Sequence, residues 1–509
     1  MSNMEHIRIH ILILLLVICS SCACNKEREL PDDGNTGFVR YSSGVSIESK
    51  ILGRNINFAI LLPSDYTSEE SKRYPVVYML HGLGDNHTSW NDKWLRIEEK
   101  VYELEAKGLP PMIYIFPEGY ASYYSNKFNG NFSYMDMFIE ELIPFVDKTY
   151  RTIPDREHRA TIGYSMGGFG AMVLPLKHPE TFSISAPLSM SFRTDEQYMT
   201  ESQDGWNQQW GSIFGGVGER GEGRITDYYK SHCPFYQFTA ENMEELSKVK
   251  WFFHCGDDEE QLLIANDDLH IQMRSNGFRH EYRVGDGGHT GSYWRTALNE
   301  VLPYIGIHMG GPNIDLSPKV ETADINLNPD GTFASAGYTN AEEKNGTAFY
   351  IAHSGLDEDL VKDIISILQR GVSAKQYMIL PCNTSVKSLE SWIEEYKSLH
   401  HVGKDISKSQ ILAIGEAGKE AYKLKDGFSR LYFDNADLLD DETQIQADPE
   451  KFWYMSQTDD GPYYKDMGGL YKACKKSGAE FQYRVRNGLP EDRDEILEGI
   501  ETIKPYIIY

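Results

Sequence analysis

The chain has 509 residues, of which 40% are hydrophobic, so it is long enough for two or three domains with a sizeable core. Its formal net charge of −26 argues against nucleic acid, or an anionic membrane surface, as a partner. A neutral polysaccharide or a small ester is compatible with that charge. We expect no cofactor and no metal, since no H-E-x-x-H motif or similar ligand spacing occurs.

The N-terminus is predicted to be a targeting segment. Residues 11–18 form an apolar run too short to span a bilayer, and small residues and cysteines after it resemble a bacterial lipobox. We therefore expect residues 1–24 to be a lipoprotein signal peptide, with Cys24 or Cys22 lipidated, and residues 25–37 to be a tether. The acidic stretch after Cys24 resembles the surface-export signal of Bacteroidetes lipoproteins. The expected location is the outer-membrane surface or the periplasm; the alternative is an ordinary secretory signal.

Strand and helix patterns alternate over residues 38–309, which we interpret as one domain. Alternating apolar residues over 38–63 predict antiparallel edge strands. Continuous apolar runs predict buried parallel strands at 76–80, 112–117, 159–162, 182–188, 251–255 and 280–284. Helices are predicted over 138–150, 169–178, 262–276 and 293–305, and a lid or insertion over 190–249. This alternation predicts an α/β fold with a mostly parallel, doubly wound sheet.

A Gly-x-Ser-x-Gly motif at residues 163–167 lies between a predicted strand and a predicted helix. That context is typical of the nucleophile elbow of α/β-hydrolases, in which Gly163 and Gly167 make room for a tight turn and Ser165 is exposed. The alternative is a glycine-rich turn in any α/β protein. A serine nucleophile needs a histidine base and an orienting carboxylate, which follow it along the chain in the order acid, then histidine.

Candidates for these partners follow later strands. His289, in a glycine-rich loop after strand 280–284, suits a general base. Four carboxylates at 257–260 follow strand 251–255, and the residues alone leave Asp258 and Glu259 both open as the acid. The backbone N–H groups of Met166 and Leu83 are candidates for an oxyanion hole, because each lies where a strand ends.

Aromatic residues are frequent in the lid and the loops, where they could stack on a phenolic acyl group or a sugar. Each of them singly is more readily explained as core. The candidate substrate-binding residues are His81, Trp90, Tyr124 and Trp294. His81 is also expected to shape the oxyanion loop.

Residues 346–509 repeat the segment order of the first domain, after a predicted linker at 310–345. Segments beginning at 348, 413, 451, 480 and 504 match those beginning at 76, 161, 250, 280 and 302. In this alignment Ala417 replaces Ser165, and Pro490 or a neighbour replaces the base. We therefore predict a smaller, non-catalytic α/β-hydrolase-like domain that lacks the edge strands and most of the lid.

Four separated motifs, at 78–84, 141–151, 163–168 and 287–294, together resemble the putative esterase family. That family contains feruloyl and acetylxylan esterases (family-one carbohydrate esterases), S-formylglutathione hydrolases, enterochelin esterases and mycolyltransferases. The resemblance covers about residues 38–306 and implies Ser165 as nucleophile, His289 as base, and the N–H groups of Leu83 and Met166 as the oxyanion hole. The family's acid is usually an aspartate three residues after the glycine that ends the strand. Here that position is Glu259, which we favour over Asp258.

The resemblance implies a serine esterase, and the expected export favours acyl esters of plant cell-wall polysaccharide, first of all feruloyl esters of arabinoxylan. The alternatives of the same class are an acetylxylan esterase and a siderophore trilactone esterase. The alternative of another class is a non-catalytic glycan-binding surface lipoprotein with the second domain as its platform. Ser165 together with His289 argues against that alternative. The sequence leaves the oligomeric state open.

Overall fold

The computed structural model describes residues 40–314, 316, 322, 327–328, 331–334, 347–369, 377–400, 409–438, 445–490 and 492–507. The predicted signal peptide and tether, with Cys22 and Cys24, lie outside the described residues, as does most of the predicted linker. Within the described part of the chain, no helix has both the length and the hydropathy required to cross a membrane.

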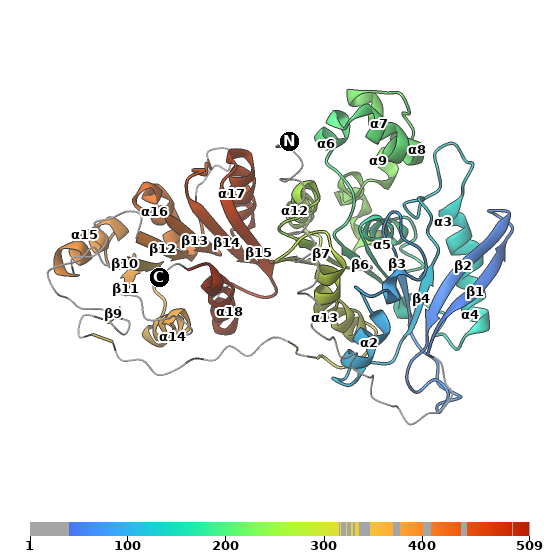
Figure 1. Cartoon of the computed structure of the whole chain (residues 1–509), viewed down its shortest axis with the longest axis horizontal. Coiled ribbons are helices and arrows are strands. Elements are labelled where there is room, and N and C mark those ends of the chain that lie inside the picture. The colour runs from blue at the N-terminus through green and yellow to red at the C-terminus, as the bar shows by residue number, and fades with distance from the viewer. Residues whose placement is uncertain are drawn as a thin grey trace, which may run out of the picture. The chain divides into compact units, whose positions relative to one another are not determined.

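One sheet of fifteen strands runs through both halves of the described chain (Figure 1). Its order is β1-β2-β4-β3-β5-β6-β7-β8-β15-β14-β13-β12-β10-β11-β9. The strands of the first half are β1 (Tyr41–Ser49), β2 (Arg54–Leu61), β3 (Val76–Leu80), β4 (Ile113–Pro117), β5 (Arg159–Tyr164), β6 (Ile184–Leu188), β7 (Lys250–Gly256) and β8 (His280–Gly285). Those of the second half are β9 (Phe333–Ala334), β10 (Thr347–His353), β11 (Tyr377–Asn383), β12 (Ser409–Ile414), β13 (Arg430–Asp434), β14 (Phe452–Thr458) and β15 (Glu480–Arg486).

Most neighbouring strands are parallel, as the alternation of strands and helices predicts. The antiparallel pairs are β1 with β2, β2 with β4, β9 with β11, and β8 with β15. The short edge strand β9 differs from the expectation that the second half lacks edge strands. Strands β11 and β13 were not predicted from the sequence.

Helices cover both faces of the sheet. In the first half they are α2 (Ile97–Glu105), α3 (Tyr134–Met137), α4 (Ile143–Thr149), α5 (Met166–Lys177), α6 (Asp195–Thr200), α7 (Gln203–Gly205), α8 (Gly211–Phe214), α9 (Asp227–His232), α10 (Pro234–Gln237), α11 (Met243–Leu246), α12 (Glu260–Ser275) and α13 (Gly291–His308). In the second half they are α14 (Glu358–Gln369), α15 (Leu389–His400), α16 (Gly418–Lys423), α17 (Tyr464–Ser477) and α18 (Arg493–Ile503). The predicted lid over 190–249 forms the short helices α6 to α11.

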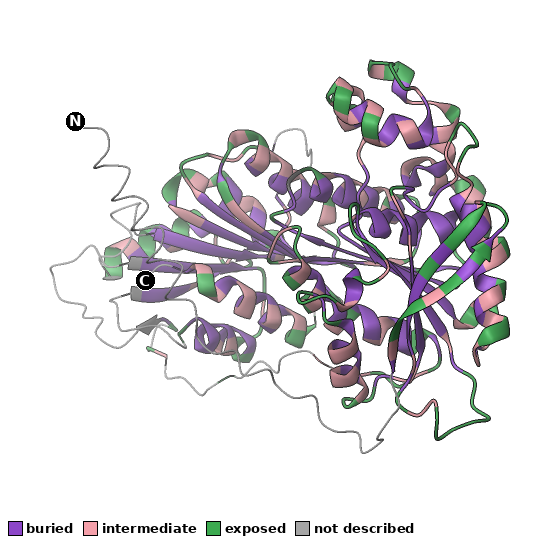
Figure 2. Cartoon of the chain, turned by 45° about the vertical axis from the view of Figure 1, so that its right-hand side comes forward, coloured by how far each residue is buried: buried purple, intermediate pink, exposed green. Residues whose placement is uncertain are grey.

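The apolar core lies on the two faces of the sheet, and Figure 2 shows the central strands buried between layers of helices whose outer surfaces are exposed. On one face, α5, α12 and α17 contribute to a cluster that continues across both halves. On the other face, α2 and α13 cover the first half and α14 and α18 cover the second, in two separate clusters. The central strands are buried on both faces, which explains their continuous apolar runs.

The two halves share one strand order, β4-β3-β5-β6-β7-β8 in the first and β11-β10-β12-β13-β14-β15 in the second. The strand ladders show which residues correspond. Val76 pairs with Arg159 in the first half, and Ala348, which aligns with Val76, pairs with Ser409 in the second. Arg159 and Ser409 are therefore counterparts. Counting on from these pairs, the counterpart of Ser165 is Gly415.

The alignment of Ala417 with Ser165 is therefore wrong by two residues. The backbone supports this correction, because Ser165 and Gly415 have φ values of 57° and 60° directly after their strands. The antiparallel pair of Val284 and Val485 matches these two residues, and their partners in the neighbouring strands are Cys255 and Gln457. Counting on from these matches, Gly461 corresponds to Glu259 and Pro490 to His289.

Candidate active site

Ser165 lies at a sharp turn between β5 and α5. Its φ of 57° and ψ of −119° are sterically unfavourable for a residue with a side chain. The glycines around it are required by close backbone approach, because a Cβ on Gly163 would lie 2.2 Å from the carbonyl oxygen of Gly167, and one on Gly167 would lie 2.1 Å from that of Leu80. The turn places the Ser165 hydroxyl at the N-terminus of α5, partly exposed, as expected of a nucleophile elbow.

His289 lies next to this hydroxyl. Its Nε2 is 2.9 Å from the Ser165 Oγ, and its Nδ1 is 2.7 Å from Oε2 of Glu259. Because a carboxylate accepts hydrogen bonds, Nδ1 carries the proton and Nε2 has a free lone pair toward the serine. The arrangement brings together a hydroxyl, an imidazole and a carboxylate from residues 165, 259 and 289.

Of the two carboxylates left open by the sequence, Glu259 contacts the imidazole. Its side chain is fully buried, and its Oε1 also accepts the Gly256 N–H at 3.0 Å. Asp258 is exposed, and its backbone N–H donates to the carbonyl of Gly287 at 3.1 Å. Glu259 immediately precedes α12 and turns inward, whereas Asp258 turns to solvent.

A serine that the sequence analysis did not select supports the carboxylate. Ser189, directly after β6, donates its hydroxyl hydrogen to Oε1 of Glu259. The indole Nε1 of Trp294 donates in turn to the Ser189 Oγ at 2.7 Å. Ser189 has a positive φ of 47° and is fully buried. Its only sequence signal is its place at the carboxyl end of a strand next to the elbow strand.

The predicted oxyanion donors are brought close by the neighbouring strands β3 and β5, where Leu80 pairs with Gly163. Met166 is the first residue of α5, so its N–H has no acceptor within the helix. Leu83 lies in the loop after β3, with an exposed side chain.

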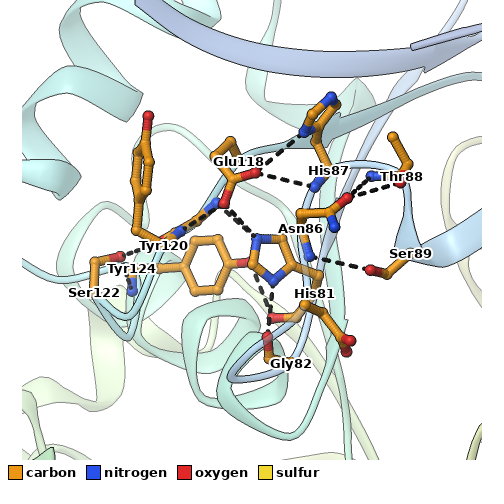
Figure 3. A network of polar contacts seen from close by, with 12 residues as sticks. His81, Gly82, Asn86, His87, Thr88, Ser89, Glu118, Tyr120, Ser122 and Tyr124 are labelled. Atoms are coloured by element: carbon orange, nitrogen blue, oxygen red, sulfur yellow. Dashed lines mark hydrogen bonds and ion pairs between the residues drawn. The ribbon is translucent and has the colours of Figure 1, made fainter. Parts of the chain in front are cut away.

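His81 fixes the start of the loop after β3 through the polar contacts drawn in Figure 3. Its Nδ1 contacts the Gly82 carbonyl at 2.8 Å, its Nε2 accepts the Gly119 N–H at 2.8 Å, and Tyr124 donates its hydroxyl to the His81 carbonyl at 3.0 Å. Acceptance at Nε2 assigns the proton to Nδ1, which donates it to the Gly82 carbonyl.

The four predicted substrate-binding residues are buried, and this corrects the prediction. His81, Trp90 and Tyr124 have no exposed surface. Trp294 is 8% exposed and lies beneath the active site, with its ring edge-on to His289 at 4.9 Å between centroids. These side chains support the loops of the site and do not face a ligand. The sequence could not show this, because aromatic residues near a site look alike in sequence whether they face the ligand or pack behind the loops.

The aromatic residues of the lid are also mostly core: Trp206, Trp210, Phe214 and Tyr229 are each no more than 1% exposed. A different tryptophan is accessible. Trp94 is 59% exposed and lies against Gly291, where an added Cβ would be 2.8 Å from the Trp94 Cβ. It is therefore adjacent to the loop that carries His289.

We call residues 256–259 the acid loop and residues 285–290 the base loop. They lie side by side, because the Asp257 N–H donates to the Gly285 carbonyl at 3.1 Å and the Gly287 N–H donates to Oδ1 of Asp257 at 3.2 Å. Burial raises the pKa of Asp257, while Arg484 and the backbone N–H groups of Gly287 and Tyr483 act in the opposite direction.

Metal ligands do not gather anywhere in the described ranges: no group of three or more His, Cys, Asp or Glu side chains there could hold an ion.

Residues 49–305 match the family model described as "Putative esterase", which spans half of the chain. The chain belongs to this family of α/β-hydrolase fold.

Among its curated relatives, Esterase Rv1288 of Mycobacterium tuberculosis is 31% identical over 151 residues, which cover 28% of this chain and 32% of that protein. The endo-1,4-beta-xylanase/feruloyl esterase of Xylanibacter ruminicola is 25% identical over 268 residues, covering 50% of this chain and 30% of that protein. The chain thus spans about a third of the length of these two relatives. A solved structure of a ferulic acid esterase is 26% identical, with a TM-score of 0.45, over 53% of this chain and 100% of that one.

Proposed function

We propose that this chain is a serine carboxylic-ester hydrolase with Ser165 as nucleophile, His289 as general base and Glu259 as the orienting carboxylate. The observation that carries the proposal is the continuous series of contacts from Glu259 Oε2 through His289 to the Ser165 Oγ, at 2.7 and 2.9 Å. Membership of the esterase family supports it. The counterpart positions of the second half, Gly415, Gly461 and Pro490, have no such groups, so the reaction is assigned to the first half.

The mechanism follows from the protonation states. Nε2 of His289 takes the hydroxyl proton as the Ser165 Oγ attacks the ester carbonyl, and the ionised Glu259 stabilises the imidazolium. The N–H groups of Met166 and Leu83 are the proposed donors to the oxyanion. The imidazolium then protonates the leaving alkoxide, which departs as an alcohol and leaves an acyl-serine. Water, deprotonated by His289, attacks this ester, and the imidazolium returns the proton to the Ser165 Oγ as the acid is released.

For the substrate we propose acyl esters of plant cell-wall polysaccharide, with the feruloyl ester of arabinoxylan first. The Xylanibacter ruminicola relative is named as both an endo-1,4-beta-xylanase and a feruloyl esterase, which supports this choice. The exposed indole of Trp94 offers an aromatic surface beside the base loop on which a phenolic acyl group could stack. We further propose export with lipid anchoring at Cys24 or Cys22, from the lipobox-like sequence alone.

The test is hydrolysis by the purified full-length protein of methyl ferulate, acetylated xylan and a siderophore trilactone, each with the Ser165→Ala variant as the blank. We expect release of ferulate that depends on Ser165. Release of acetate alone, or opening of the lactone alone, would keep the serine mechanism and change the substrate. No release from any of the three, together with retention of the protein on xylan, would favour the glycan-binding alternative.

A further inference from the structure

The two halves meet where β8 and β15 pair in antiparallel fashion at Val284 and Val485. On either side of this pair, a buried arginine of one half contacts a buried aspartate of the other. Arg283 Nη1 lies 2.5 Å from Oδ2 of Asp459, and Arg484 Nη1 donates to Oδ2 of Asp257. All four side chains are less than a tenth exposed.

The two contacts are built alike, so the seam has an approximate two-fold symmetry. Arg283 also donates to the Tyr282 carbonyl at 3.0 Å, and the Tyr282 N–H donates to Asp459 at 3.3 Å. On the other side, Arg484 donates to the Tyr483 carbonyl at 2.8 Å, and the Tyr483 N–H donates to Asp257 at 3.2 Å. The matched geometry makes one arginine a natural control for the other.

The two contacts differ in what they hold. Arg283 has its remaining ion pairs with Glu281 and Glu300. Its partner Asp459 lies two residues before Gly461, which is the counterpart of Glu259 and has no side chain to bind a histidine. Asp257 belongs to the acid loop, two residues before Glu259, and its Oδ1 accepts the N–H of Gly287 in the base loop. The second arm of Arg484, Nη2, pairs at 2.9 Å with Asp286, which lies three residues before His289.

One guanidinium from the second half therefore binds a carboxylate on each of the two loops that present the triad. The distance between Glu259 and His289 depends on how these loops lie against each other, because each group is only two or three residues from the carboxylate that Arg484 holds. A planar guanidinium with fixed donor directions sets the relative placement of two carboxylates better than a single-point cation does.

We propose that Arg484 is a positioning residue for the triad, by which the second half of the chain completes the active site of the first. This rests on the proposed serine mechanism. The second half thus has a part in the reaction although it has no nucleophile of its own: it sets the spacing of the acid and base loops. Loss of the guanidinium lets the loops shift and leaves Asp257 buried without its cation.

The test measures the phosphonylation of Ser165 by a fluorophosphonate probe in the full-length protein, which needs no knowledge of the natural ester. Arg484→Met is expected to lower the limiting rate constant about tenfold to a hundredfold, the range seen when a reacting geometry is displaced, with the probe's half-saturation concentration within about twofold. Arg484→Lys, which reaches one of the two carboxylates, should recover part of the rate. Arg283→Met breaks the matched contact with Asp459, which belongs to neither the acid loop nor the base loop, and should lose much less of the rate than Arg484→Met.

The outcomes separate this inference from the proposed function. An unlabelled wild type would overturn the serine mechanism itself. Equal losses in Arg484→Met and Arg283→Met would show that the seam acts only through stability, and an unchanged rate in Arg484→Met would overturn the inference directly. If Arg484→Met does not fold, the Asp286→Asn variant tests the inference in its place. Its side chain is 66% exposed, so the fold should tolerate it, and a lower rate constant at unchanged half-saturation is expected. A wild-type rate would refute the role of Arg484.

Discussion

Glu259 binds two loops at once: Oε2 lies 2.7 Å from Nδ1 of His289, and Oε1 accepts the hydroxyl hydrogen of Ser189. Because both oxygens of this carboxylate accept hydrogen bonds, the Glu259 side chain has one orientation. The imidazole bound to it is therefore held toward Ser165.

Ser165→Ala should reduce ester hydrolysis at least about a thousandfold, because no other described hydroxyl contacts His289 Nε2. The positive φ is no worse for alanine than for serine, so the unfolding temperature should stay within about two degrees. The measurements are ester turnover and thermal unfolding. As a control, Ser212→Ala, which removes a hydroxyl bonded only to the Gln209 carbonyl, should keep full activity. Substantial turnover by Ser165→Ala would refute the elbow assignment.

Glu259→Gln should lower kcat about a hundredfold or more, since the neutral amide neither fixes the Nδ1–H tautomer nor stabilises the imidazolium. Asp258→Asn, at the neighbouring exposed position, should change kcat by less than about twofold. Both are read from initial rates on one soluble ester. The reverse ranking would move the acid to Asp258.

Ser189→Ala should lower kcat about tenfold with little change in KM, because it removes one charge-assisted hydrogen bond from Glu259 and leaves the Gly256 N–H in place. Ser189→Thr keeps the hydroxyl and should be the more active of the two variants. Steady-state kinetics on the same ester decide the matter, and equal activity in Ser189→Ala and the wild type would show that this contact is dispensable.

Trp94→Ala should raise KM for an aryl ester about threefold to tenfold with kcat nearly unchanged, the effect of losing about 1 kcal/mol of stacking. Trp94→Phe should lie between that variant and the wild type. For an acetyl ester, which has no ring to stack, the two variants should match the wild type. A uniform effect on both esters would argue against aromatic stacking at this position.

Because the carboxyl of Asp267, on α12, is buried, we expect the free energy of unfolding to depend on pH. Asp267 is fully buried, and burial raises its pKa to about 7, although Lys472 and the hydroxyl of Tyr483 act in the opposite direction. A carboxyl whose pKa is raised on folding favours the folded state below its unfolded pKa, and that contribution is lost as pH rises through about 7.

The matched variant is Asp267→Asn, which is neutral throughout and keeps an oxygen to accept from Tyr483 at 2.8 Å. Its unfolding free energy minus that of the wild type should increase between about pH 4.5 and pH 7.5, and then level off. Denaturant unfolding at a series of pH values measures this difference. A difference that stays constant with pH would contradict the raised pKa.

Much of the fold could be predicted from the sequence, because strands buried on both faces of a parallel sheet have continuous runs of apolar residues. The runs at 76–80 and 280–284 form β3 and most of β8, and the glycine motif at 163–167 marks the elbow. Local spacing could not decide between Asp258 and Glu259, because adjacent residues point in different directions only once the start of α12 is fixed.

Other features could not be predicted because they depend on contacts between distant segments. The sequence shows an aspartate after β7 and after β14, and an arginine in β8 and in β15, but not that each arginine crosses to the other half. The two-residue error at Ala417 has the same origin, since the short glycine-containing repeat fits two alignments and only the ladder between β10 and β12 selects Gly415.

The seam between β8 and β15 has a mechanical consequence. Its ladder is the single pair of Val284 and Val485, whereas β7 and β8 are joined along six pairs. Tension applied to the two ends of the described chain would therefore meet its shortest strand ladder there, where the arginine–aspartate contacts and the packing of α12 against α17 also hold the halves together. We expect stretching to part the halves as two intact bodies before either one unravels, and Ser165 to lose reactivity at that first step.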